Sequence, residues 1–145
     1  MTEGALYCDG ASFGNPGPSG IGVVLEIGDE VVEHSEDIGW GTNNEAEYRA
    51  LITGLRMALD RGVDVLHVRA DSQLIVRQVT GEYKIKKKEL QRLALQARSL
   101  VERFASVKFE HVLRDLNERA DALSKAGAEH AKARGVEPPD DGLIS

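Results

Sequence analysis

Four carboxylates in this sequence stand where a predicted strand ends or a predicted helix begins. Asp9 and Asp71 each close an apolar run, whereas Glu47 and Asp121 lie near the starts of two helical patterns. Acids placed in this way can converge on one cleft, and a bundle of unpaired carboxylates is stable mainly when cations bind it. Oxygen ligands without clustered Cys or His suit Mg²⁺ or Mn²⁺ rather than zinc. The sequence therefore points to a magnesium site and to phosphate chemistry.

The elements that must position these acids are visible as periodic patterns. Thr42 and Glu45 have the spacing of a capping box, and apolar residues follow at helical spacing until Gly62. The segment 14–20 has the composition of a turn-rich loop. Strands are predicted at the run that ends at Asp9 and at 21–27, 31–38, 65–70 and 107–113, and helices at 42–62, 72–79, 87–104 and 117–134.

This order, three strands joined by hairpins and then strand–helix crossovers, predicts an α/β fold with one five-stranded mixed sheet. Three strands are antiparallel, the later ones are parallel, and helices flank the sheet. Parallel strands carry their ligand sites at their carboxyl ends, where Asp9 and Asp71 stand. We expect a single domain over residues 1–134, followed by a flexible tail over 135–145.

The composition is that of an ordinary globular protein, with 41% hydrophobic and 29% charged residues in 145. No apolar run is long enough to span a membrane, and the N-terminus lacks the layout of a signal peptide, so a cytoplasmic location without membrane contact is expected. The single Cys8 is expected to be a buried, reduced thiol.

The net charge of −6 argues against a nucleic-acid partner, but its distribution does not. The segment 84–103 carries seven basic residues and only two acids. Such a stripe is compatible with gripping one phosphate backbone. Taken alone, however, a charge run more often marks a solvated helix face.

Five linked motifs, in order over residues 4–130, together resemble the signature blocks of type 1 ribonuclease H. A further run, Gly81–Lys86, is similar to the branch of that family found in archaea and some bacteria, which lacks a basic protrusion. The five motifs are Asp9-Gly10-Ala11-Ser12, Asn15-Pro16-Gly17, Thr42-Asn43-Asn44-Glu45-Ala46-Glu47-Tyr48, Asp71-Ser72-Gln73-Leu74 and Asn117-Glu118-Arg119-Ala120-Asp121.

The resemblance implies a ribonuclease H-like fold and an endonuclease that cuts the RNA strand of an RNA/DNA hybrid, leaving 5′-phosphate and 3′-hydroxyl ends. By the family's pattern, Asp9, Glu47, Asp71 and Asp121 would hold two Mg²⁺ ions, with Mn²⁺ as a substitute. One ion would activate the attacking water and the other would stabilise the leaving oxygen. The alternative interpretation is that each acid is only a helix cap or a surface charge. That would be plausible for any one acid alone, but much less so for four acids that each lie within a family motif.

Substrate choice requires a reader of the 2′-hydroxyl, the group that distinguishes RNA from DNA. The resemblance implies that amides would read the minor groove of the hybrid, because an amide both donates and accepts hydrogen bonds. Thr42 would contact a phosphate of the DNA strand, and capping of the helix by Asn43 and Asn44 is a compatible second role. The implied readers are Ser12, Asn15, Asn43, Asn44 and Gln73.

Two departures from the family pattern stand out. Many members carry a His in a loop before the last acid, but the segment 114–117 has none, and His111 is predicted to lie within a strand. Arg114 would take its place by contacting phosphate, and its role would be electrostatic because arginine cannot act as a base. Some relatives also insert a Trp-rich basic element, for which 79–87 has no room. Lys84, Lys86, Lys87 and Lys88 would partly compensate, with steep salt dependence.

Two alternatives to a hybrid-specific nuclease stay open: a broader nuclease that also cuts double-stranded RNA, and a module that binds hybrid without cutting it. Intact acids argue against the module, because four negative charges near phosphate do not help a pure binder. A 3′–5′ exonuclease is set aside, since Asp9-Gly10-Ala11 lacks the second acid that such enzymes carry on the first strand. A monomer is expected, although the sequence does not fix the oligomeric state.

Overall fold

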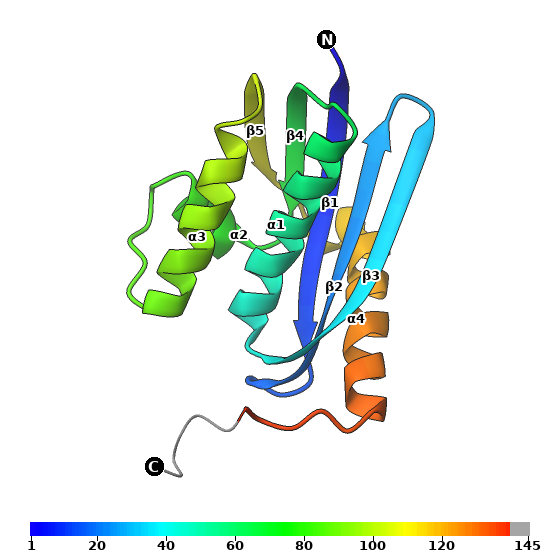
Figure 1. The fold of residues 1–145 in the computed structure, drawn as a ribbon, viewed down its shortest axis with the longest axis vertical. Helices are drawn as coiled ribbons and strands as arrows, with labels where there is room; N and C mark the ends of the chain where they lie inside the picture. Colours follow the sequence, from blue (N-terminus) through cyan, green and yellow to red (C-terminus); the bar gives the residue numbers. More distant parts are fainter. Residues whose placement is uncertain (140–145) are drawn as a thin grey trace.

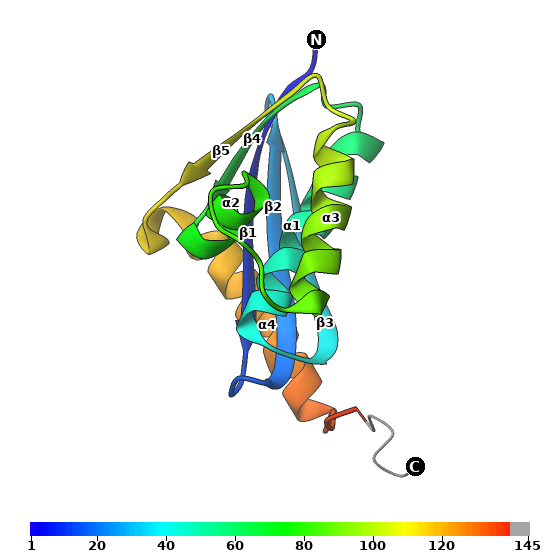
Figure 2. The same ribbon diagram turned by 90° about the vertical axis from the view of Figure 1, so that its left-hand side faces the viewer.

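The computed structural model describes residues 1–139 and has one five-stranded sheet with helices on both faces (Figures 1 and 2). The strand order β3-β2-β1-β4-β5 confirms the predicted mixed sheet. The elements, in chain order, are β1 (Glu3–Ser12), β2 (Gly17–Ile27), β3 (Glu30–Gly41), α1 (Asn43–Asp60), β4 (Val65–Ala70), α2 (Gln73–Val79), α3 (Lys88–Val101), β5 (Ser106–His111), a short 3-10 turn η1 (Arg114–Asn117) and α4 (Glu118–Ala133).

The sheet is antiparallel on one side of β1 and parallel on the other. β1 pairs antiparallel with β2, which pairs antiparallel with β3. On the other side β1 pairs parallel with β4, and β4 pairs parallel with β5. The last parallel pair between β1 and β4 joins Cys8 to Ala70, so Asp9 and Asp71 both come directly after it.

Two glycines let helices approach the sheet closely from opposite faces. A Cβ added at Gly10 of β1 would lie 2.3 Å from the backbone carbon of Ala46 in α1. A Cβ added at Gly22 of β2 would lie 2.1 Å from the backbone oxygen of Ala120 in α4. Gly22 pairs with Asp9 and so shares its face, whereas Gly10 is the next residue along β1 and points to the other. The α1 and α4 helices therefore press on opposite faces of the same strand pair.

Local sequence signals explain where the helices begin. Thr42 caps α1 by accepting from the amide of Glu45, and the Glu45 side chain accepts from the amide of Thr42, which confirms the capping box. Ser72 caps α2 in the same way through the amide of Ile75. The apolar stripe of α3 is buried against α1, as its spacing predicts, through Leu90, Ala94, Ala97 and Leu100.

Several predicted boundaries were wrong in the antiparallel part of the sheet. The segment 14–20 is not all loop, because β2 begins at Gly17, which pairs with Gly41 at the end of β3. Asp9 does not end β1 either, since the strand continues to Ser12 in its pairing with β2. Part of the predicted tail, residues 140–145, lies outside the described residues. Within 1–139, no helix combines the length and the hydropathy needed to cross a membrane.

Candidate active site

Three of the four predicted acids come together at the carboxyl ends of the parallel strands. Asp9 from β1, Glu47 from the first turns of α1 and Asp71 after β4 each offer a carboxylate oxygen, and these oxygens lie within 4.8 Å of one another. Asp9 is only 6% exposed. Glu47 reaches the cluster because the missing side chain of Gly10 lets the start of α1 lie against β1. Three elements distant in sequence thus supply one compact oxygen cluster.

The fourth acid, Asp121, borders this cluster and is ion-paired within its own helix. The Lys125 ammonium lies 2.9 Å from Asp121 Oδ2, one helical turn further along α4. Asp121 also shares a side-chain hydrogen bond with Asp9. Burial is the largest single influence and works against ionisation, but the contacts with Lys125 and Asp9 and the charge of Arg114 together lower the pKa of Asp121. The structure therefore places Asp121 beside Asp9 at the border of the cluster, where its contacts favour the charged form.

Burial dominates the electrostatics of Asp9 and Glu47. It raises the pKa of Asp9 to about 8, with the Asp71 charge adding to the rise and the Ser124 hydroxyl opposing it. It also raises the pKa of Glu47 to about 7, which a hydrogen bond from Ser72 and the charge of Arg114 oppose. Burial favours the neutral form of these carboxyl groups, whereas a nearby positive charge would favour the charged form. An all-oxygen cluster of this kind therefore fits a hard divalent cation such as Mg²⁺ or Mn²⁺.

Several side chains contact the acids without having been predicted to act there. His111, at the end of β5, donates from Nε2 to the backbone oxygen of Asp71 at 3.1 Å. Ser72 contacts Glu47, while Ser124 and Lys125 contact Asp9 and Asp121. Ser124 and Lys125 follow Asp121 by three and four residues, so helical spacing was the sequence signal that could have indicated them. For His111 the sequence pattern indicated only a strand residue.

Arg114 lies at the rim of the cluster, beside Asp71. Its Nε is 3.8 Å from Asp71 Oδ2, and its side chain is 80% exposed. η1 carries it directly out of the end of β5, with Val112 bonded to the backbone oxygen of Ala70. The guanidinium is therefore free to reach a ligand above the acids.

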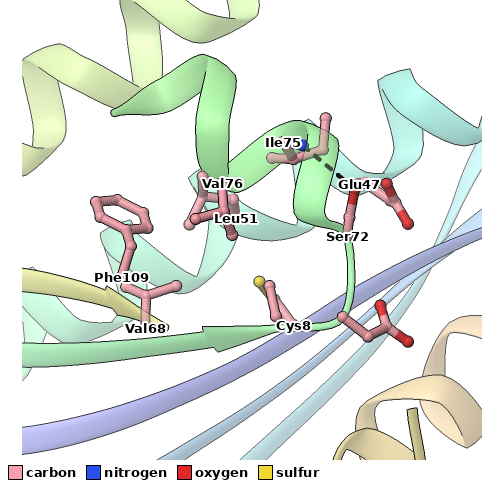
Figure 3. Close-up of a pocket in the computed structure, with 10 residues that line it drawn as sticks. Cys8, Glu47, Leu51, Val68, Ser72, Ile75, Val76 and Phe109 are labelled. Carbon is pink, nitrogen blue, oxygen red and sulfur yellow. Dashed lines mark hydrogen bonds between the residues drawn. The ribbon is translucent and has the colours of Figure 1, made fainter. Parts of the chain in front are cut away.

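The floor of the site is apolar and closed. Figure 3 shows Cys8, Leu51, Val68, Val76 and Phe109 on the side of a small pocket away from the Glu47 carboxylate. The pocket measures about 10 Å³, no more than one water molecule needs. Cys8 is a free, buried thiol, as expected, and burial raises its pKa far above the usual range. The pocket beside Glu47 and Asp71 is therefore too small to hold a small-molecule substrate.

The predicted substrate residues gather partly around the start of α1. Asn15 Oδ1 accepts from the Asn43 amide at 3.1 Å, and Ser12 Oγ donates to the Gly41 carbonyl at 3.0 Å. These contacts join the turn between β1 and β2 to the segment that contains Thr42. Asn44 lies in the first turn of α1, and Gln73 is exposed at the start of α2, next to Ser72.

The predicted lysines lie on a different part of the molecule. Lys84, Lys86, Lys87 and Lys88 are all exposed in the connection from α2 to the first residue of α3. An open groove of about 520 Å³ runs beside them, and Tyr83, Ile85 and Arg98 are among the residues that line it.

Comparisons with known proteins agree with this geometry. A family profile described as "Reverse transcriptase-like" matches residues 7–127. The chain is 46% identical over 127 residues to a protein of Halobacterium salinarum named "Ribonuclease HI". That match covers 86% of this chain and 64% of the relative, so the chain spans less than two thirds of the relative's length.

Two solved structures are similar over nearly the whole chain. The N-terminal RNase H domain of a Mycobacterium tuberculosis protein matches with a TM-score of 0.90 and 37% identity, covering 94% of this chain and 100% of that one. LC11-RNase H1, from compost, was solved in complex with an RNA/DNA hybrid. It matches with a TM-score of 0.83 and 38% identity, covering 89% of this chain and 99% of that one.

Proposed function

The chain belongs to the ribonuclease H family, and on that basis we propose that it is an endoribonuclease for the RNA strand of RNA/DNA hybrids. The products would carry 5′-phosphate and 3′-hydroxyl ends. The observation that carries the proposal is the convergence of Asp9, Glu47 and Asp71 within 4.8 Å, with Asp121 at their border. The hybrid bound to LC11-RNase H1 supports the choice of substrate.

The four acids would hold two Mg²⁺ ions, or Mn²⁺ in their place. The chemistry that such ions supply when bound is a water of lowered pKa and compensation of charge on the leaving 3′-oxygen. Burial raises the pKa values of Asp9 and Glu47, and they would lose their protons as the cations bind, because a bound cation favours the charged carboxylate. The residues therefore act by holding charge and fixing the position of the scissile phosphate.

Arg114 would add positive charge at the rim, above Asp71. Its exposure leaves the guanidinium able to contact a phosphate oxygen next to the cluster. An arginine side chain cannot serve as a general base, so Arg114 would not take a proton from the attacking water. Its contribution would be the electrostatic stabilisation of charge that develops on the phosphate.

Selection of RNA would depend on the residues joined at the start of α1. The Asn15–Asn43 and Ser12–Gly41 contacts hold that surface in one arrangement before substrate arrives. Asn44 and Gln73 would extend it towards the acids along the minor groove, and Thr42 would meet a DNA phosphate. The four lysines before α3 would bind backbone phosphate without reading sequence, so affinity should fall steeply with salt.

The test is cleavage of end-labelled RNA in an RNA/DNA hybrid by the purified chain, with Mg²⁺, Mn²⁺ or EDTA. Double-stranded RNA and double-stranded DNA are the matched substrates. Metal-dependent cutting of the hybrid alone would support the proposal in full. Cutting of double-stranded RNA as well would indicate the broader nuclease, and binding of hybrid without cutting in either metal would overturn the enzymatic proposal.

A further inference from the structure

The α4 helix presents one hydroxyl, that of Ser124, to the acid cluster from the face opposite α1. Ser124 is fully buried. It is held there by the close approach of α4 to β2, because a Cβ added at Gly22 would lie 2.5 Å from the Ser124 amide nitrogen. One at Gly20 would lie 2.5 Å from the Ser124 backbone oxygen. The tight packing of α4 on β2 therefore leaves the Ser124 hydroxyl little freedom to move away from the sheet.

The hydroxyl has two acceptors within reach and only one proton. Ser124 Oγ lies 2.8 Å from Asp9 Oδ2 and 2.8 Å from the Asp121 carbonyl oxygen. The carbonyl is one turn earlier in α4, where it can accept the helical hydrogen bond from the amide four residues on. An ionised carboxylate is the stronger acceptor. When Asp9 is charged, the proton therefore points to Asp9.

We propose that Ser124 is a positioning residue for the divalent cations. Its hydroxyl fixes the rotation of the Asp9 carboxylate and joins that carboxylate to the helix that carries Asp121. This inference rests on the proposed function, because it assigns Ser124 to the same metal site. Groups that orient a metal ligand typically change metal affinity by about 10- to 100-fold when they are removed.

Ser19 provides a matched control within the same fold. It is also fully buried, but its hydroxyl donates only to backbone oxygens, those of Gly17 at 2.9 Å and Gly41 at 3.2 Å. Ser124→Ala and Ser19→Ala each remove one buried hydroxyl. Only the first of these hydroxyls touches an acid of the cluster.

The experiment is calorimetric titration of the metal-free full chain with Mn²⁺ for the wild type, Ser124→Ala and Ser19→Ala. We expect the dissociation constant for Mn²⁺ to rise about tenfold or more in Ser124→Ala and to stay unchanged in Ser19→Ala. Ser124→Cys, which retains a weak donor, should give an intermediate value. It also serves as the second variant if Ser124→Ala does not fold by circular dichroism.

Cleavage against Mn²⁺ concentration gives a second readout. Excess Mn²⁺ should restore the rate of Ser124→Ala, whereas a merely structural defect would lower the rate at every concentration. Wild-type affinity in Ser124→Ala would overturn the positioning role and leave the proposed nuclease intact. A wild-type chain that binds no Mn²⁺ and cuts no hybrid would overturn the proposed function and this inference with it.

Discussion

The guanidinium of Arg98 on α3 donates from Nη2 to the backbone carbonyl of Gln78 near the end of α2, at 2.6 Å. Its Nε reaches the carbonyl of Val79 at 3.2 Å. The Gln78 side chain accepts from the Tyr48 hydroxyl at 2.6 Å, so α1, α2 and α3 meet at one largely buried polar contact. Ser72, which caps α2, directly follows Asp71. This contact therefore holds the far end of the helix that begins beside the acid cluster.

Replacing Arg98 by Met should loosen α2. The substitution removes the guanidinium donor from both carbonyls, and although the Gly81 amide still donates to Gln78 at 3.2 Å, the loss should cost roughly 1–3 kcal/mol in the free energy of unfolding. Urea denaturation measures that loss, and hydrogen exchange should show faster opening of the α2 amides. Arg92→Met, an exposed position on the same helix, is the control. Equal stability of the two variants would contradict the role given to Arg98.

Asp71→Asn should retain the fold and abolish cleavage. The amide has nearly the shape of the carboxylate but no charge, so one ligand for the proposed cations is lost. Cleavage of labelled hybrid and circular dichroism measure the two effects. Asp115→Asn changes an exposed acid of η1 and should cut at the wild-type rate. A fully active Asp71→Asn protein would end the assignment of the metal site.

Arg114→Ala should slow cleavage in part without removing it. The side chain is 80% exposed, so the loss should be smaller than the roughly hundredfold or greater effect of removing a donor from an enclosed site. Single-turnover cleavage rates measure it. Arg114→Lys keeps the charge and should give an intermediate rate. An unchanged rate in Arg114→Ala would show that the exposed guanidinium does not meet the phosphate.

The metal-free chain should become less stable as the pH rises. The raised pKa values, about 8 for Asp9 and about 7 for Glu47, mean that the folded chain holds protons which the unfolded chain has already released. The unfolding free energy therefore falls between about pH 4, near the unfolded pKa values, and pH 8. Thermal unfolding in EDTA, compared with Glu47→Gln, measures this slope. Excess Mg²⁺ should offset it, and identical slopes in the wild type and Glu47→Gln would contradict the raised pKa of Glu47.

Gly22→Ala should push α4 away from the sheet. The new methyl would lie 2.1 Å from the Ala120 backbone oxygen, a contact that neither backbone can accept without moving. Overpacking of this kind costs typically 1–3 kcal/mol or more, and the shift would also separate Asp121 from Asp9. Denaturation and Mn²⁺ titration measure the two effects. At Gly41, where an added Cβ meets nothing closer than 3.7 Å, the same change should cost little stability.

Local patterns in the sequence predicted much of the helical part of the fold. The capping box at Thr42 and the bounds of β4 were confirmed because each depends on residues that are neighbours in the chain. The start of β2 at Gly17 was missed because it is set by pairing with Gly41, at the far end of β3. A composition rich in Gly and Pro indicates a turn whether or not a partner strand lies beside it.

The candidate site likewise combines residues that local motifs could predict with a contact that only the folded structure reveals. The four acids could be found from their motifs, since each motif is a short run of residues. The contact of Ser124 with Asp9 could not, because 115 positions separate the two residues and only the packing of α4 on Gly22 brings them together. Helical spacing after Asp121 indicates only that Ser124 lies near that acid, and it gives no sign of the contact with Asp9.

The order of the elements along the chain has a consequence for the protein while it is being synthesised. Asp9 lies in the first strand and Asp121 in the last helix, more than a hundred residues later. A ribosome adds about 5–20 residues each second, so on the order of ten seconds pass between the emergence of the first acid and that of the fourth. Throughout that interval the growing chain cannot complete the cluster. If the proposed function is correct, a growing molecule would lack one of its four proposed metal ligands until α4 has been synthesised.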